Sequence, residues 1–280
     1  MFLSHKEKER LRKAYGEWAV ITGASSGIGL ELARRVADAG INAVLVARNE
    51  DKLVATAKEL TATYGVATRV IAADVSEPGG LKWIMDVTAD LKVGLFIASA
   101  GYGTSGPFLI SSIEEEVNML RVNCDALLVL THHFARRFTE QRRGGIILMS
   151  SIVDFQGVPY AAHYAATKAY VQTLAEGLAA ELRPYNVDVL AAAPGPVRSG
   201  FGSRAGMKMA QSLQPAAIGV PILRALGKQH TVFPGGLTKL LMTGLRTVPR
   251  WGKVKIMEKV MRGMTQHQKE MDSTTSKLLS

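Results

Sequence analysis

The chain has 280 residues, a length that suits one large α/β domain or two ordinary domains. Its composition, 47% hydrophobic and 21% charged residues, excludes disordered and collagen-like proteins. Its single cysteine, Cys124, excludes an intrachain disulfide and a cysteine-based zinc cluster, and it favours a reducing compartment. No metal site is predicted. The formal net charge of +10 is concentrated toward the two ends of the chain.

Short apolar runs alternate with helix-length amphipathic stretches along most of the chain. The apolar runs predict strands over 18–22, 43–47, 69–72, 95–98, 145–149, 188–192 and 231–233. The stretches between them predict helices near 27–39, 50–64, 79–91, 112–142, 160–183 and 214–227. This alternation predicts right-handed βαβ units, and so an α/β fold with one doubly wound parallel sheet of about seven strands and helices on both faces.

Two basic helical extensions, over 1–15 and 236–280, are predicted to flank a central domain over 16–235. The C-terminal extension carries nine Lys or Arg against three Asp or Glu, in two amphipathic helices that break near Pro249. These helices are either solvated tails or a surface for an anionic membrane or an acidic partner. No nucleic-acid motif, membrane span or signal peptide is predicted, and we expect a cytoplasmic protein.

The first predicted strand runs into a glycine-rich loop that opens directly into a helix. The spacing Gly-x-x-x-Gly-x-Gly permits a tight turn and lets the backbone approach a pyrophosphate, which the helix N-terminus stabilises. A turn without a ligand is the alternative. The loop also contains a G-x-S-x-G match, but a hydrolase elbow needs strands and an oxyanion loop before it. The predicted cofactor contacts are Gly23, Ser25, Ser26, Gly27, Ile28 and Gly29.

The end of the second predicted strand lacks the acidic residue that would hold the ribose of NAD. Arg48 stands there instead, and its guanidinium suits a 2′-phosphate, so NADP(H) is predicted in preference to NAD(H). An exposed arginine at a strand end is the alternative. Asn49 is a further predicted contact. Asp74, followed by Val75, closes the third strand and would either accept a hydrogen bond from adenine or cap the next helix.

Tyr164 and Lys168 are four residues apart and share one face of a predicted helix. An ammonium beside a phenol lowers its pKa from about 10 toward the range useful for proton transfer. Ser151 ends a predicted strand thirteen residues earlier, so its hydroxyl would help to hold a carbonyl oxygen. Asn123 would interrupt the helix predicted over 112–142 and hold a water that links Lys168 to solvent. The Tyr-Lys pair alone would indicate only a surface pair, but the ordered set predicts catalysis.

The loop over 22–29, the four candidate catalytic residues and the run Pro194-Gly195-Pro196-Val197-Arg198-Ser199 resemble the short-chain dehydrogenase/reductase superfamily over residues 16–235. The resemblance implies a Rossmann-type fold and a homodimer or homotetramer. It implies that Tyr164 is the general acid–base, Ser151 positions the carbonyl, Lys168 binds the nicotinamide ribose and tunes Tyr164, and Asn123 completes a proton relay. The further cofactor contacts that it implies are Ala100, Gly101, Pro194, Gly195, Val197 and Ser199.

Two positions depart from the family pattern. Ala98-Ser99 stands where the family has Asn-Asn, which puts the side-chain bracing of the central strands in doubt. Ser199 replaces a frequent threonine and keeps its hydroxyl.

The segment over 15–23 is similar to the β-ketoacyl-CoA reductase and 17β-hydroxysteroid dehydrogenase branch. This similarity implies NADPH-dependent reduction of a hydrophobic ketone, such as a 3-oxoacyl thioester or a steroid-like ketone. Phe201, Met207, Met209 and Leu213 would form an apolar lid over the substrate, or simply part of the core. The alternatives are a non-catalytic NADP-binding regulator and a peripheral membrane protein that acts through its C-terminal helices.

Overall fold

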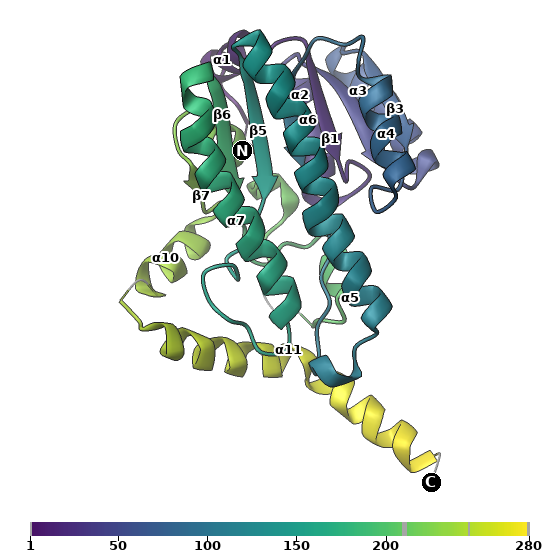
Figure 1. The fold of residues 1–280 in the computed structure, drawn as a ribbon, viewed down its shortest axis with the longest axis vertical. Helices are drawn as coiled ribbons and strands as arrows, with labels where there is room; N and C mark the ends of the chain where they lie inside the picture. The colour runs from purple at the N-terminus through teal and green to yellow at the C-terminus, as the bar shows by residue number, and fades with distance from the viewer. Residues whose placement is uncertain (1, 209–211, 246, 279–280) are drawn as a thin grey trace.

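One parallel sheet organises the molecule, as a computed structural model of residues 2–208, 212–245 and 247–278 shows (Figure 1). The strand order is β3-β2-β1-β4-β5-β6-β7, so the direction of winding reverses between β1 and β4. This order confirms the predicted doubly wound, Rossmann-type sheet, in which a crevice forms at the carboxyl ends of the strands. The strands are β1 (Trp18–Thr22), β2 (Asn42–Ala47), β3 (Thr68–Ala72), β4 (Val93–Ala98), β5 (Gly144–Met149), β6 (Val187–Ala192) and β7 (Thr231–Val232).

Helices cover both faces of the sheet. Alternate residues of β1 point to opposite faces, so Ile21 and Val20 belong to different core clusters. The cluster around Ile21 is covered by α2 (Gly27–Asp38), α3 (Glu50–Tyr64) and α9 (Gly219–Ala225). The cluster around Val20 is covered by α4 (Pro78–Val87), α6 (Ala126–Gln141) and α7 (Ala162–Leu182). The strands therefore carry continuous apolar runs because both faces are buried.

The helix predicted over 112–142 is interrupted, as expected at Asn123. It consists of α5 (Ile113–Leu120), a π-helical turn (Arg121–Asp125) and α6. A π turn inserts an extra residue and turns side chains toward a new direction, which is common at functional sites. The helix predicted over 214–227 is divided into a short 3-10 turn (Pro215–Ala217) and α9, and further 3-10 turns occur at Phe108–Ile110 and Arg183–Tyr185.

The N-terminal helix α1 (His5–Tyr15) is docked under the amino ends of the central strands. Ser4 and Glu7 form a capping box at its start. The Tyr15 hydroxyl donates to Asp188 Oδ2 at 2.8 Å, and Arg10 donates to the Leu223 and Leu226 carbonyl oxygens at 2.9 and 2.8 Å. The helix thus covers apolar strand ends that would otherwise face water.

The C-terminal helices α10 (Gly236–Leu245) and α11 (Arg250–Leu278) lie across the opposite end of the molecule, below the carboxyl ends of the strands (Figure 1). The chain breaks between them beside Pro249, as predicted. Met261 of α11 is buried in a small cluster with Tyr102 and Tyr164. A further short helix, α8 (Phe201–Arg204), joins this end. None of the helices in the described ranges is long and apolar enough to cross a bilayer.

Candidate active site

The loop between β1 and α2 is formed by close approaches of the backbone. A Cβ at Gly29 would lie 2.3 Å from the Gly23 carbonyl oxygen, and one at Gly23 would lie 2.9 Å from the Ser99 oxygen. Glycine is therefore required at both positions. Ser26 is the N-cap of α2 but makes no side-chain capping bond, so the first N–H groups of the helix remain available to an anion. This cradle fits a pyrophosphate.

The run over 194–199 lies against this loop. A Cβ at Gly27, where φ is +58°, would lie 2.7 Å from Ser199 Cβ. Val197 forms a β-bridge with Leu213, which holds the run in place. On its other side, a Cβ at Gly195 would lie 2.9 Å from the Thr238 hydroxyl of α10. The run over 194–199 therefore lies between the glycine-rich loop and α10.

Arg48 and Asp74 lie at the carboxyl ends of neighbouring strands and form an ion pair at 3.7 Å. Burial opposes ionisation of Asp74, but hydrogen bonds from Ser76 and the charge of Arg48 hold its pKa below the ordinary value. The prediction that Asp74 caps the next helix is wrong, because Glu77 is the N-cap of α4. Asn49 caps α3 by accepting from the Lys52 N–H, so its side chain serves the helix. Arg48, the residue before Asn49, is exposed.

Ser151, Tyr164 and Lys168 meet at the carboxyl end of β5. Tyr164 and Lys168 are buried on one face of α7, as their spacing predicts, and the Lys168 Nζ lies 5.9 Å from the centre of the Tyr164 ring. Lys168 donates to the Met149 carbonyl oxygen at 2.9 Å. The Ser151 side chain hydrogen-bonds with the Tyr164 phenol. The structure thus brings together a proton donor, a hydroxyl partner and a cation.

Burial dominates the ionisation of this group. It raises the pKa of Tyr164 above its ordinary value, against the effect of the Ser151 hydrogen bond. It also lowers the pKa of Lys168 to about 8. The predicted lowering of the Tyr164 pKa is therefore not found in this arrangement, because burial raises it and the ammonium donates to the Met149 carbonyl oxygen. The phenol therefore holds its proton at neutral pH in this arrangement.

Asn123 is fully buried in the π-helical turn and braces two segments. Its Nδ2 donates to the Tyr102 carbonyl oxygen at 2.8 Å and to Thr167 Oγ1 at 3.0 Å, and its Oδ1 accepts from the Tyr102 N–H. A Cβ at Gly101 would lie 3.0 Å from Asn123 Oδ1 and 3.5 Å from Lys168 Nζ. Asn123 therefore lies near Lys168, and the proton relay through it stays a prediction.

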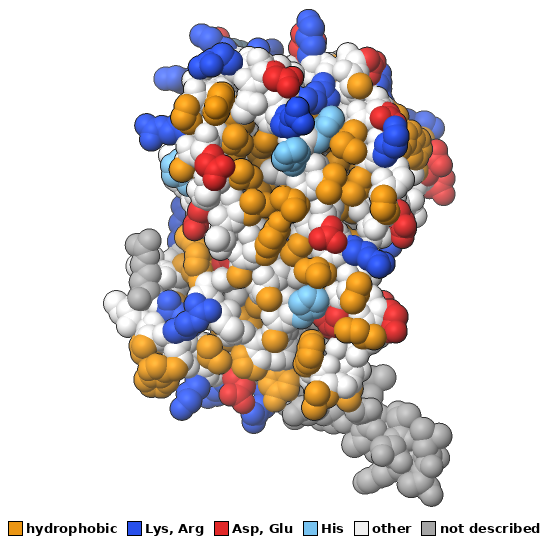
Figure 2. Space-filling model, viewed as in Figure 1, with side chains coloured by type: hydrophobic (Ala, Val, Ile, Leu, Met, Phe, Trp, Pro, Cys, Tyr) orange, Lys and Arg blue, Asp and Glu red, His pale blue; other side chains and the backbone are white. Residues whose placement is uncertain are grey.

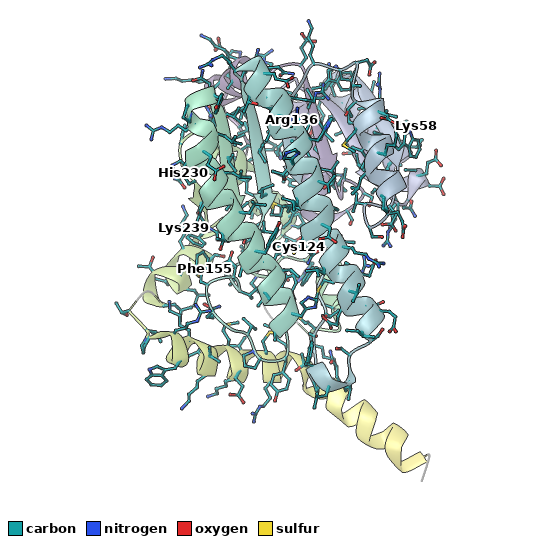
Figure 3. All side chains as sticks on the ribbon, viewed as in Figure 1. Lys58, Cys124, Arg136, Phe155, His230 and Lys239 are labelled. Atoms are coloured by element: carbon teal, nitrogen blue, oxygen red, sulfur yellow. The ribbon has the colours of Figure 1, made fainter. Side chains whose placement is uncertain are left out.

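Cys124 follows in the same turn and faces α7 (Figure 3). Burial raises the pKa of its thiol to about 11, so the side chain is neutral and acts as a small apolar group.

Thr22 is a site residue that the sequence did not reveal. Its hydroxyl accepts hydrogen bonds from the Ser99 and Ala100 N–H groups, both at 3.1 Å. These N–H groups belong to the segment in which Ala98-Ser99 replaces Asn-Asn. The hydroxyl of β1 therefore braces the end of β4 from across the strand pair. A contact between residues so far apart in the chain has no local signal.

An apolar cover lies over Tyr164. The Phe201 ring centre is 5.2 Å from that of Tyr164, and Met207 joins the same cluster with three methionines of α11, which are Met257, Met261 and Met264. Gln268 of α11 donates to the Gly206 carbonyl oxygen at 2.7 Å and so ties this cover to the helix. Leu213 instead packs with the core near Val197, and Met209 lies outside the described residues. Of the predicted lid, Phe201 and Met207 therefore lie at the site.

Replacing Thr22 with valine tests the bracing of the β4 end. Valine keeps the shape of threonine but removes the acceptor of the Ala100 N–H and leaves the Ser99 N–H with the Ile97 carbonyl oxygen alone, so we expect the free energy of unfolding to fall by about 2 kcal/mol. Denaturant titration measures it. Thr22→Ser keeps the hydroxyl and should retain most of the stability. Equal stability of Thr22→Val and the parent protein would contradict this role.

Comparisons with known proteins agree with this geometry. The family described as short chain dehydrogenase matches residues 17–209. The chain is 36% identical over 179 residues to a 7beta-hydroxysteroid dehydrogenase of Collinsella aerofaciens, which covers 64% of this chain and 68% of that protein. It is 38% identical over 185 residues to a very-long-chain 3-oxoacyl-CoA reductase of Meyerozyma guilliermondii, which covers 62% of this chain and 54% of that protein. The chain thus spans about half the length of the yeast reductase.

A solved structure has the same fold. The short-chain dehydrogenase of Sphingobium yanoikuyae, in complex with NADPH, superposes with a TM-score of 0.74 at 30% identity, covering 83% of this chain and 98% of that one. The matched residues include the glycine-rich loop and the buried serine, tyrosine and lysine. The chain therefore belongs to the short-chain dehydrogenase family, as an oxidoreductase that binds a nicotinamide cofactor and acts on hydroxyl or keto groups.

Proposed function

We propose that the protein reduces a ketone on a hydrophobic substrate with NADPH, or oxidises the corresponding secondary alcohol. The observation that carries this proposal is a buried Ser151-Tyr164-Lys168 group beneath an apolar cover. Such a cover binds apolar surface and excludes water from the reacting atoms. The steroid dehydrogenase and the long-chain reductase among the relatives support a steroid-like ketone or a 3-oxoacyl thioester as the substrate class.

The side chains divide the work of the proposed reaction. The nicotinamide, when bound, supplies the hydride. The Ser151 and Tyr164 hydroxyls hold the carbonyl oxygen, and Tyr164 donates its proton to that oxygen. Lys168, with a pKa of about 8, carries its charge in most molecules at neutral pH and stabilises the phenolate that remains. A regulator without turnover would need none of these buried groups.

Replacing Tyr164 with phenylalanine tests the proton transfer. The variant keeps the packing against Phe201 but has no proton to donate, so ketone reduction should fall by about 10²–10⁴-fold. The rate is followed by NADPH absorbance, with steroid ketones and 3-oxoacyl thioesters compared against small polar sugars. NADPH binding, measured by fluorescence, should change little. The exposed Tyr185→Phe is the control, and unchanged turnover in Tyr164→Phe would refute the assignment.

We propose that Arg48 selects NADP(H). Its guanidinium is exposed at the edge of the crevice, with a single carboxylate, Asp74, at 3.7 Å in place of an acid at the end of β2. A guanidinium binds a phosphate dianion through charge-assisted hydrogen bonds. The NADPH in the Sphingobium structure supports this choice.

Replacing Arg48 with alanine should weaken NADPH binding by about 10–100-fold, which corresponds to a charged hydrogen bond. NADH lacks the 2′-phosphate, so its dissociation constant should stay the same. Titration calorimetry with both cofactors measures the two effects. Arg34→Ala, which removes an arginine paired with Glu59 on the helical face, is the control. Equal weakening of NADPH and NADH would contradict the proposal.

We further propose that α10 and α11 contact an anionic membrane surface. One face of α11 is buried against the cover of the active site, while Trp251, Ile256 and Val260 are exposed, as are Leu240 and Leu241 of α10. Exposed lysines lie between them, and this combination of apolar and basic side chains is typical of interfacial helices. Apolar side chains are visible at this lower end of the molecule (Figure 2). A membrane at this surface would hold a lipid substrate beside the cover.

A second apolar surface favours a homodimer or homotetramer. Val117 and Leu120 of α5, Leu128 and Val129 of α6 and Tyr170 of α7 are exposed. Figure 2 shows apolar side chains gathered on the face of the molecule that these helices form. Large exposed apolar patches mark association surfaces.

Reversing the charge of Lys255 and Lys259 tests the membrane contact. The double variant with glutamate should lose most of its flotation with phosphatidylserine vesicles, because each lysine contributes about 1 kcal/mol near such a surface. Lys52→Glu with Lys58→Glu makes the same charge change on exposed residues of α3 and should float like the parent protein. Equal flotation of both variants would contradict the proposal. A fall in the mass measured by light scattering would instead assign α10 and α11 to contacts between copies of the chain.

A further inference from the structure

A carboxyl group lies behind the catalytic residues and has no part in the mechanism described above. Asp154 follows Ser151 by three residues in the turn after β5 and is buried. Its Oδ2 contacts the Ser150 hydroxyl and lies 3.5 Å from the Ser151 N–H. Its Oδ1 is buried and has no hydrogen-bond partner among the described residues. The next residue, Phe155, is labelled in Figure 3 and packs against Phe233 with ring centres 5.6 Å apart.

The contacts of Ser150 indicate where a proton lies. Its Oγ touches two oxygens, Asp154 Oδ2 and the Lys168 carbonyl oxygen, the latter at 3.1 Å. A hydroxyl has one hydrogen, and a carbonyl oxygen only accepts. Both contacts are hydrogen bonds when Asp154 is protonated and donates to Ser150, while Ser150 donates to Lys168. An ionised carboxyl would break this chain and leave the buried Oδ1 charged without a partner, which is costly.

The Asp154 carboxyl is electrostatically coupled to the catalytic residues. Burial raises its pKa to about 7. The charged groups that act on it lie on α7: the Lys168 ammonium favours the ionised form, and the Glu176 carboxylate opposes it. In return, a negative charge on Asp154 raises the pKa of Tyr164. A change of protonation at Asp154 therefore changes the pKa of Tyr164, the residue proposed to transfer the proton.

We propose that Asp154 is a positioning residue that works in two protonation states. Neutral Asp154 holds the Lys168 carbonyl through Ser150 and so fixes the turn of α7 that carries Tyr164 and Lys168. Ionised Asp154 opposes loss of the proton from Tyr164. The ionised form therefore makes Tyr164 a weaker proton donor to a carbonyl oxygen, and it also delays the phenolate that alcohol oxidation requires. The direction of this effect rests on the proposed function, whereas the protonation of Asp154 does not.

The protonation state is tested by carbon NMR of the full chain with ¹³C-labelled aspartate and bound NADPH. The Asp154 carboxyl signal, identified by its absence in Asp154→Asn, should titrate near neutral pH, well above the ordinary aspartate value of about 3.9. A titration at or below that ordinary value would overturn the proposal. If Asp154→Asn does not fold, the spectrum of the parent protein still decides, because no other described aspartate has a raised pKa among those with a resolved shift.

The dependence of stability on pH gives a second measurement that needs no substrate. The pKa of Asp154 is higher in the folded protein than in the unfolded chain. The stability that neutral Asp154 contributes is therefore fully present below about pH 4 and is lost as the pH rises toward about 7. The midpoint temperature of the parent protein should therefore fall over this range relative to that of Asp154→Asn. The exposed Asp86→Asn is the matched control and should follow the parent protein. A parent protein that gains stability over this range relative to Asp154→Asn would show an ordinary ionised carboxylate and overturn the proposal.

The coupling to Tyr164 is tested on the oxidation of a 7β-hydroxysteroid. In Asp154→Asn the pH at which kcat rises should move down by about one unit, because the negative charge near the phenol is gone. KM should change little, whereas a loosened site would raise KM and leave the pH profile in place. An unchanged profile with active enzyme would overturn the coupling. Absence of turnover in the parent protein would fault the proposed substrate, and the two measurements above would still decide the protonation of Asp154.

Discussion

The hydrogen bond from Lys168 to the Met149 carbonyl oxygen is the contact on which the active site depends. It joins the first turns of α7 to the end of β5, so the helix that carries Tyr164 has a defined position on the sheet. It also satisfies one donor of an ammonium that is almost fully buried. Burial then sets both ionisations, because it disfavours the charged form of each group. The Tyr164 phenol therefore retains its proton, and the Lys168 ammonium loses its proton more readily than an exposed lysine does.

Glycines and one threonine hydroxyl shape the backbone around the carboxyl end of β1. Gly23 and Gly29 allow the first loop to fold back on itself, which leaves the N-terminus of α2 facing the crevice. Thr22 braces the end of β4, where the family pattern has asparagine side chains. A hydroxyl on β1 thus accepts from two N–H groups that follow β4.

The basic ends of the chain have different roles. In α1 two basic residues have partners: Lys8 pairs with Asp38 of α2, and Arg10 donates to carbonyl oxygens at the end of α9. These contacts hold α1 to α2 and α9. In α11, Lys255 and Lys259 are exposed, and the buried methionines on the other side of the helix touch the cover of the active site.

Local sequence pattern determined much of the fold and of the candidate site. Alternating apolar runs and amphipathic stretches predicted the seven strands, since strand and helix periodicities depend on neighbouring residues. The four-residue spacing placed Tyr164 and Lys168 on one helical face for the same reason. The sequence also marked Asn123 as the point where the long helix is interrupted. The tertiary structure alone decided the rest. The pairing of Thr22 with Ser99 and the contact of Ser150 with Lys168 join distant segments, and the burial that raises the pKa of Tyr164 comes from helices packed around it. Desolvation and contacts across strands depend on the whole fold, so no local pattern reports them.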